Sequence, residues 1–171
     1  MLLPDALRYK AWADRRTLDA VAAIDAQRFP AAAAFARQQL NHMVRVEELF
    51  GARLSASDEP HASTNSQVVP ELAELDRRLA ASNEWLQGYV RSVSAAELQE
   101  TIRFTFTDGK RGMLRREEVI FHLINHGSYH RGAIGHALDL AHAPRPADTF
   151  TVFIHAAEPH RRGDTVPANP E

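Results

Sequence analysis

Three histidines are spaced four residues apart within residues 121–132, namely His122, His126 and His130. In a helix a step of four residues turns the chain by only ~40° and rises about 6 Å, so adjacent members can point at one common point. All three cannot reach one ion, because His122 and His130 start about 12 Å apart and metal–nitrogen bonds are only ~2.1 Å long. We therefore expect one adjacent pair to bind a metal together with a ligand from elsewhere in the chain.

His42 is the candidate for the ligand from elsewhere, because it shares the apolar stripe of its own helical segment with Val46 and Leu49. Glu47 and Glu48 lie roughly 100° or more away on the helical wheel and are expected to face solvent or another interface. Three imidazoles leave at least one coordination position open, which is typical of catalytic rather than structural metal sites. The competing interpretation is a hydrogen-bonded network of core histidines, since a buried imidazole without a partner costs about 2 kcal/mol or more.

Four segments with helical periodicity must position these histidines. Pro4 and Pro30 suit the first turns of two of them, and an alanine run after Pro30 has high helix propensity. The four predicted helices cover about residues 4–23, 30–54, 70–90 and 114–143. Between the last two, apolar Ile102 and Phe104 alternate with polar residues ahead of a turn at Asp108. The sequence thus predicts an all-α fold, a four-helix bundle with a short β-hairpin or extended arm between the third and fourth long helices.

The composition indicates one globular domain. The chain has 171 residues, which predicts a single domain over residues 1–158 and a charged, proline-rich flexible tail over 159–171. A net charge of −2 argues against nucleic acid as a partner. The chain has no cysteine, which excludes disulfides, thiolate zinc sites and a cysteine nucleophile. Without a signal-like start or a run of ~18 apolar residues, we expect a cytoplasmic protein with no membrane contact.

The segment LINHGSYHRG at residues 123–132 resembles the N-H-x-x-x-H-R-G-Q helix motif of the DinB/YfiT-like superfamily of metal-dependent enzymes. Supporting segments are YKAWAD at 9–14, LNHM at 40–43 and TDG at 107–109, and the resemblance extends over about residues 5–155. It implies a four-helix bundle, one divalent ion (nickel, zinc or iron) and frequent homodimers.

Carried over to this chain, the resemblance implies that His42, His126 and His130 are the metal ligands. His122 is then an additional histidine, either behind the ligands or lining the mouth of the site. Ala133 departs from the family motif, which usually has glutamine there, and this weakens any inference about the substrate.

The chemistry of such a site depends on what fills its open position. A divalent ion bound by neutral imidazoles keeps its full positive charge and strongly acidifies a bound water or thiol. Water would give a hydrolase, whereas the resemblance favours a low-molecular-weight cellular thiol and an S-transferase or isomerase. The main alternative is a non-catalytic metal-binding dimer, since no clear general base accompanies the ligands. A DNA-associated damage-response role is a third class, which the negative charge opposes.

Several other residues have weaker claims to the site. Tyr9 and Trp12 are expected to pack in the bundle, although either could form a wall of the site. Arg131 could neutralise an anionic substrate or form a surface salt bridge, and Arg115 could steer a carboxylate. Four further histidines are expected to be plain surface residues in loops or the tail: His61, His142, His155 and His160.

Overall fold

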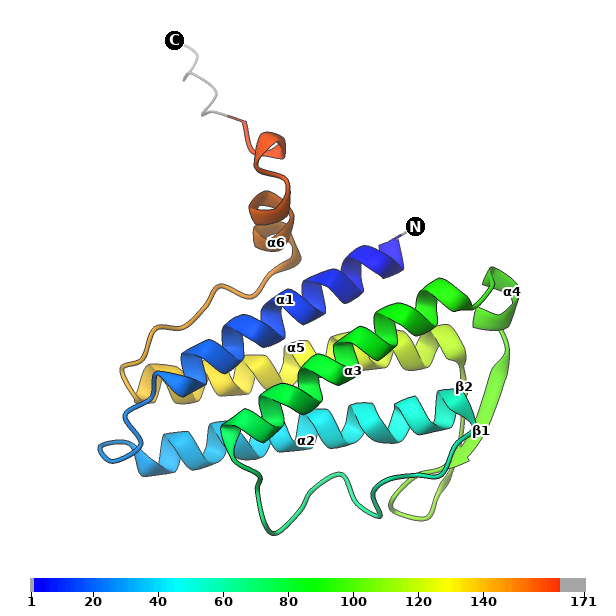
Figure 1. Ribbon diagram of the computed structural model, residues 1–171, viewed down its shortest axis with the longest axis horizontal. Helices are drawn as coiled ribbons and strands as arrows, with labels where there is room; N and C mark the ends of the chain where they lie inside the picture. The colour runs from blue at the N-terminus through cyan, green and yellow to red at the C-terminus, as the bar shows by residue number, and fades with distance from the viewer. Residues whose placement is uncertain (1, 164–171) are drawn as a thin grey trace, which may run out of the picture.

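Four long helices form an up-down-down-up bundle in the structure, a computed structural model that describes residues 2–163 (Figure 1). They are α1 (Leu2–Ala22), α2 (Pro30–Ser55), α3 (Leu72–Ser92) and α5 (Arg116–Leu140). Helix α2 packs against α5 and α3, and α1 packs against α3 and α5, so that each helix has two main neighbours. The predicted four-helix bundle is confirmed, and the two helices that carry the candidate ligands lie side by side.

A short helix and a hairpin connect α3 to α5. Helix α4 (Ala95–Leu98) begins with a capping box formed by Ser94 and Glu97. Strands β1 (Thr101–Thr105) and β2 (Arg111–Arg115) then pair antiparallel, which confirms the predicted hairpin. Its turn contains Gly109 at a φ of 83°, a conformation that favours glycine.

Two predicted helix starts differ from the structure, each for a local reason. Leu114 belongs to β2, where it pairs with Ile102, so that α5 begins two residues later than the apolar periodicity indicates. Helix α3 begins at Leu72 rather than at Pro70, because the carbonyls of Val69 and Pro70 accept hydrogen bonds from Arg37 and remain outside the helix.

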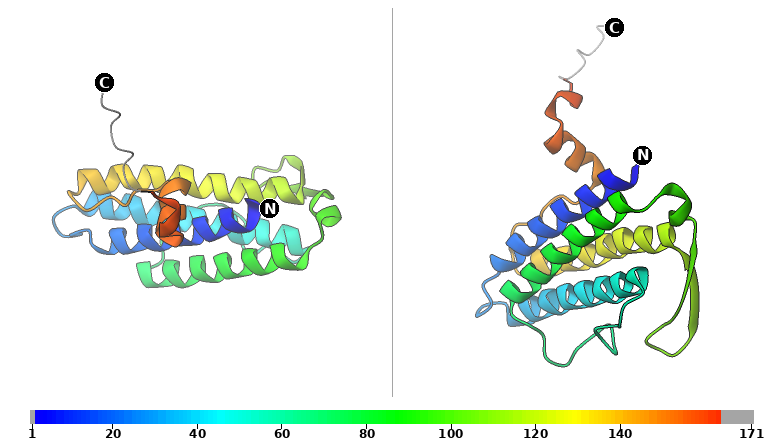
Figure 2. Two further views of the ribbon diagram at one scale, coloured as in Figure 1. Left: turned by 90° about the horizontal axis from the view of Figure 1, so that it is seen from above. Right: turned by 45° about the vertical axis from the view of Figure 1, so that its right-hand side comes forward.

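The chain after α5 returns along α1 and ends in a small helix. The apolar stretch near residue 152 forms α6 (Phe150–Ala157), which stands off the bundle beside α1 (Figure 2). Phe150 and Phe153 pack there against Tyr9. The predicted tail starts with a short 3-10 helix, η1 (Pro159–Arg161), and its residues 164–171 lie outside the part that the structure describes.

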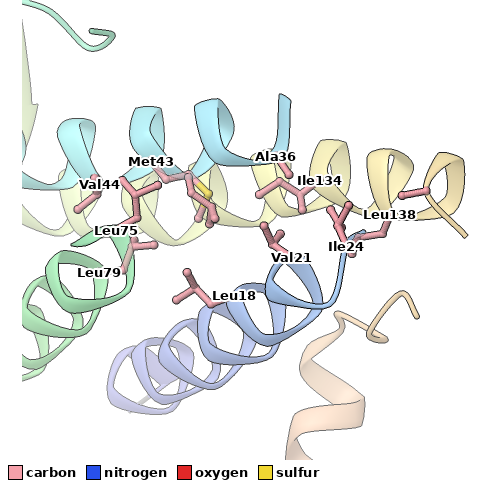
Figure 3. Packing of buried hydrophobic residues seen from close by; sticks show 12 residues of the cluster. Leu18, Val21, Ile24, Ala36, Met43, Val44, Leu75, Leu79, Ile134 and Leu138 are labelled. Atoms are coloured by element: carbon pink, nitrogen blue, oxygen red, sulfur yellow. The ribbon is translucent and has the colours of Figure 1, made fainter. Parts of the chain in front are cut away.

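The buried core packs the four long helices against one another, including α2 against α5. Figure 3 shows one buried cluster to which all four long helices contribute, for example Leu18, Met43, Leu79 and Ile134. Full burial of each such side chain stabilises the fold by about 1.5–3 kcal/mol. Among residues 2–163, no helix is both long and apolar enough to span a bilayer.

Candidate metal centre

Three histidine side chains from two helices meet at one point between α2 and α5. Nε2 of His126 lies 3.1 Å from Nε2 of His42 and 3.0 Å from Nε2 of His130. One nitrogen from each ring lies within 4.8 Å of the others, and all three side chains are half-buried. This three-histidine cluster (His42, His126 and His130) could hold a metal ion.

The outer nitrogens of two rings are fixed by acceptors. Nδ1 of His42 lies 3.2 Å from the carbonyl oxygen of Thr64, and Nδ1 of His130 lies 2.6 Å from Oε1 of Gln39. Both acceptors require a proton on Nδ1, which leaves both Nε2 atoms with lone pairs directed at His126. A neutral His126 can donate to only one of them. At least one pair of nitrogen lone pairs therefore faces each other, an arrangement that a bound cation would stabilise.

The local environment keeps these imidazoles neutral, the form that binds metal. Burial lowers the pKa of His126 to about 3, with further contributions from the neighbouring histidines and Lys10. Burial and the adjacent His42 lower the pKa of His130 to about 4. The spacings of 3.0 and 3.1 Å between donor atoms also suit bonds of ~2.1 Å to one shared ion. The donor set therefore fits a divalent metal.

A cavity of about 290 Å³ adjoins the three-histidine cluster and is lined by His42 and His126 at that end. Its wall comes from α2, the hairpin, the 56–71 connection and α5. The apolar lining side chains are Val46, Leu49, Phe50, Phe106 and Leu114. An open coordination position on this side would face a largely apolar space of small-molecule size.

His122 lines this cavity and does not join the cluster. Its ring contacts those of Phe50 and His126, at centroid distances of 5.2 and 5.3 Å. Burial lowers its pKa. Of the two positions that the sequence allowed for His122, the structure places it in the wall of the cavity.

A group of buried charges, which we call the ion network, occupies the bundle interior between α1, α2, α3 and α5. Nζ of Lys10 lies 2.8 Å from carboxylate oxygens of both Asp14 and Glu47, and all three side chains are almost fully buried. Arg131 donates to Asp14 at 2.8 Å and to Asp148 at 2.9 Å. Burial raises the pKa of Glu47, while Lys10 and Arg131 hold the pKa of Asp14 below its usual value against the effect of burial.

The ion network decides one open alternative and corrects one expectation. Of the two environments expected for Glu47, solvent or another interface, the structure places it in an interface, because it is buried where α2 packs against α1 and α3, with its carboxylate paired to Lys10. Arg131 is neither a surface residue nor free for an anionic substrate, since its side chain is 1% exposed and its charge is taken by Asp14 and Asp148. The sequence does contain an indication of this network. Lys10 and Asp14 stand four residues apart among apolar residues of the same helix face, a spacing that allows an ion pair.

Tyr9, Trp12 and Arg115 do not line the cavity. Tyr9 donates a hydrogen bond of 2.5 Å to Asp148, and Trp12 packs on Phe153. Arg115 is the last residue of β2, where it forms ion pairs with Glu117 and Glu118. The expectation that Arg115 steers a substrate carboxylate is wrong, because the hairpin removes it from the helical stripe of the ligands.

Glu48 and His61 form a second polar contact outside the site. His61 lies in the 56–71 connection but is half-buried, bonded to the carboxylate of Glu48, which also accepts 2.5 Å and 2.9 Å bonds from Arg78. His61 is therefore not a plain surface residue. His142 and His160 are exposed as expected, whereas His155 lies half-buried on α6.

Gln39 and Thr64 accept hydrogen bonds from the ligand candidates, but no motif or spacing in the sequence predicts these two contacts. Their roles depend on which face of α2 meets α5 and on the path of the 56–71 connection. Ala133, at the position of the family glutamine, offers no polar side chain, and the acceptor for His130 comes from α2 instead.

Comparison with known protein families matches residues 2–163 to the DinB family. Comparisons with curated proteins and with solved structures gave no match. The match spans nearly the whole chain and includes all four long helices and the three-histidine cluster. This protein belongs to the DinB family.

Proposed function

We propose that the protein is a metal-dependent enzyme in which His42, His126 and His130 bind one divalent ion (nickel, zinc or iron) and the substrate is a low-molecular-weight thiol. The observation that carries this proposal is the meeting of three Nε2 atoms, 3.0 and 3.1 Å apart, beside a small-molecule cavity. A bound divalent ion would supply positive charge that lowers the pKa of a coordinated thiol or water.

The protein's own residues would prepare the site before substrate arrives. Thr64 and Gln39 hold the protons of His42 and His130 on Nδ1 and so keep the Nε2 atoms available. The apolar wall, with Leu49, Phe50 and Leu114, limits the access of bulk water. The ligand set would therefore be rigid, neutral and partly dry.

The lining of the cavity supports a thiol over water as the nucleophile. Among residues 2–163, no aspartate or glutamate lines it, and His122 is the one imidazole in its wall besides the ligand candidates. Hydrolysis usually employs a general base near the attacking water, whereas a thiolate is itself a strong nucleophile. S-transfer or thiol-dependent isomerisation is therefore the leading reaction class, and hydrolysis is the second.

Elemental analysis of protein purified without a histidine tag tests the ligand assignment. We expect about one ion per chain, lost in His126→Ala and in His130→Ala. His136→Ala is the matched control, because His136 lies on the same helix with an exposed side chain and should retain the ion. Metal content unchanged in the ligand variants would refute the assignment.

Activity assays then separate the catalytic from the non-catalytic hypothesis. An aromatic or epoxide electrophile is offered with a panel of cellular thiols, and turnover is compared between metal-loaded and chelator-treated protein. Absence of metal-dependent turnover with any thiol, ester or amide would favour a non-catalytic metal-binding bundle.

We also propose that the protein forms a homodimer through α5. Phe121, Tyr129 and Leu140 are 66%, 74% and 61% exposed, and they lie within about 100° of one another around this helix. Light scattering on the wild type and on Tyr129→Glu tests the proposal, with a dimer expected for the first and a monomer for the second.

A further inference from the structure

We propose that the cavity beside the three-histidine cluster binds a neutral, monocyclic aromatic molecule with one hydrogen-bonding group, of the size and polarity of phenol. The ring would lie against Phe50, Phe106 and Leu114, and the polar group would bond to His122. If the proposed function holds, the acceptor would be such a ring that carries an epoxide as its hydrogen-bonding group: the thiol sulfur forms a C–S bond as the epoxide C–O bond breaks, and the freed oxygen takes up the proton of the thiol. The binding claim itself needs no metal and can be tested separately.

The size of the cavity suits one substituted ring together with a thiol sulfur. Its volume is about 290 Å³, at the lower limit of the ~300–1,000 Å³ usual for small-molecule pockets. An apolar cavity of roughly 150 Å³ is enough to hold benzene. One substituted ring therefore fits, with room left for a thiol sulfur between it and the histidines.

The charges around the cavity favour a neutral ligand. Within the described part of the chain its lining includes no carboxylate, and Arg53 is its one permanently charged side chain. Arg53 is already committed, since it donates to the carboxylate of Glu59 at 2.8 Å and to the carbonyl of Thr105 at 3.0 Å. An anionic ring would have to displace Glu59, and a cationic ring would find no counter-charge. Either charge would therefore be desolvated without compensation.

His122 supplies the polar contact. Its half-buried ring stands between the apolar ring of Phe50 and the ring of His126, and it has no hydrogen-bond partner among residues 2–163. A neutral imidazole carries one donor and one acceptor nitrogen, so it can bond to a hydroxyl in either direction. A ligand that leaves this ring unpaired would lose one hydrogen bond relative to a phenol.

The hairpin fixes the outer wall of the cavity. Phe106 packs edge to face on Phe104, with ring centroids 4.8 Å apart, and Phe104 packs in the same way on Phe50. Gly112 permits this packing, because a Cβ there would lie 2.6 Å from the ring of Phe106 and 2.7 Å from that of Phe104. The outer wall is therefore a packed aromatic surface formed by β1 and by Phe106, which follows β1 in the turn.

The test is a titration of ¹⁵N-labelled full-length protein with phenol, toluene and benzoate, followed by amide chemical shifts. Phenol should shift the amides around His122 and Leu114 at millimolar concentrations, and benzoate should not. Leu114→Trp fills the cavity and should weaken phenol binding by about tenfold or more. Met113→Trp is the matched control, because the side chain of Met113 points outward from the same strand and is 61% exposed; it should bind phenol normally.

A second variant isolates the hydrogen bond. His122→Phe keeps a ring in the wall and should weaken phenol binding by about fivefold, the effect of one neutral hydrogen bond, without weakening toluene binding. Absence of phenol binding, or equal binding to the wild type and Leu114→Trp, would overturn the proposal. Equal effects of His122→Phe on phenol and toluene would overturn the role of His122.

Metal content measured on the same samples separates this inference from the proposed function. Phenol binding by a protein that holds no ion would support the cavity assignment and refute the metal proposal. An ion held at the three-histidine cluster without phenol binding would refute the cavity assignment alone.

Discussion

Replacement of Lys10 by methionine should lower the free energy of unfolding, because it leaves buried carboxylates of the ion network without their ammonium partner. Lys10 is fully buried, and its ammonium donates to Asp14 and Asn83 and pairs with Glu47, at 2.8 Å in each case. Methionine fills a similar volume but supplies no charge. Removal of one partner from a buried ion pair typically costs about 3–5 kcal/mol, a large share of the roughly 5–15 kcal/mol that stabilises a domain.

Most of this cost should fall on Glu47. Asp14 keeps Arg131 and Asn83 as partners, whereas Glu47 keeps the hydroxyl of Ser82, which donates to it at 2.6 Å. Burial already raises the pKa of Glu47, and loss of Lys10 would raise it further. The folded variant would then bind a proton that the unfolded chain releases above about pH 4.5, so its stability falls as pH rises.

Urea unfolding followed by circular dichroism, with a chelator present throughout, measures the effect. We expect Lys10→Met to lose about 3 kcal/mol or more near pH 8, and less near pH 5. Thermal scans should show a melting temperature lower by about 10 °C at the higher pH. The double variant Lys10→Met/Glu47→Gln should recover much of the loss. A loss that is below about 1 kcal/mol near pH 8, or that is the same at both pH values, would refute this account.

Three further predictions concern single contacts. Gln39→Leu should weaken metal binding by about 10–100-fold through loss of the acceptor for Nδ1 of His130, as measured by competition with a chromogenic chelator; full affinity would show that Gln39 does not orient the ligand. Gly112→Ala should destabilise the fold by about 1–3 kcal/mol, because its Cβ would collide with Phe104 and Phe106, and urea unfolding compares it with the exposed control Gly163→Ala, whose Cβ would meet no other atom within 4 Å. Arg131→Lys should cost about 2 kcal/mol in the same assay, because lysine cannot bond to Asp14, Asp148 and Ser128 together; unchanged stability would mean that charge alone matters there.

The fold was largely predictable because its signals are local. Apolar periodicity located all four long helices, and the alternation around Phe104 located the hairpin. Errors occurred at the ends, where a side chain from another element decides the outcome. Arg37 holds the carbonyls before α3 outside that helix, and the hairpin ladder takes Leu114 from α5.

The candidate site was predictable in part. Spacing of four residues on one helix brings His126 and His130 together, and the apolar stripe around His42 turns that residue inward. The failure concerns charge. Arg131 was expected to neutralise an anionic substrate or form a surface salt bridge, yet it is buried and neutralised by Asp14 and Asp148, and a helical wheel of one helix shows no such partners.

Sequence was therefore sufficient to assign side chains to a common face of a helix, because backbone hydrogen bonds set the repeat at 3.6 residues wherever that helix lies. Three contacts required the folded chain: Gln39 with His130, Thr64 with His42, and His122 with a cavity closed by the hairpin. Those contacts depend on how helices and loops pack against one another, and packing is settled by burial across the whole chain rather than by any one segment.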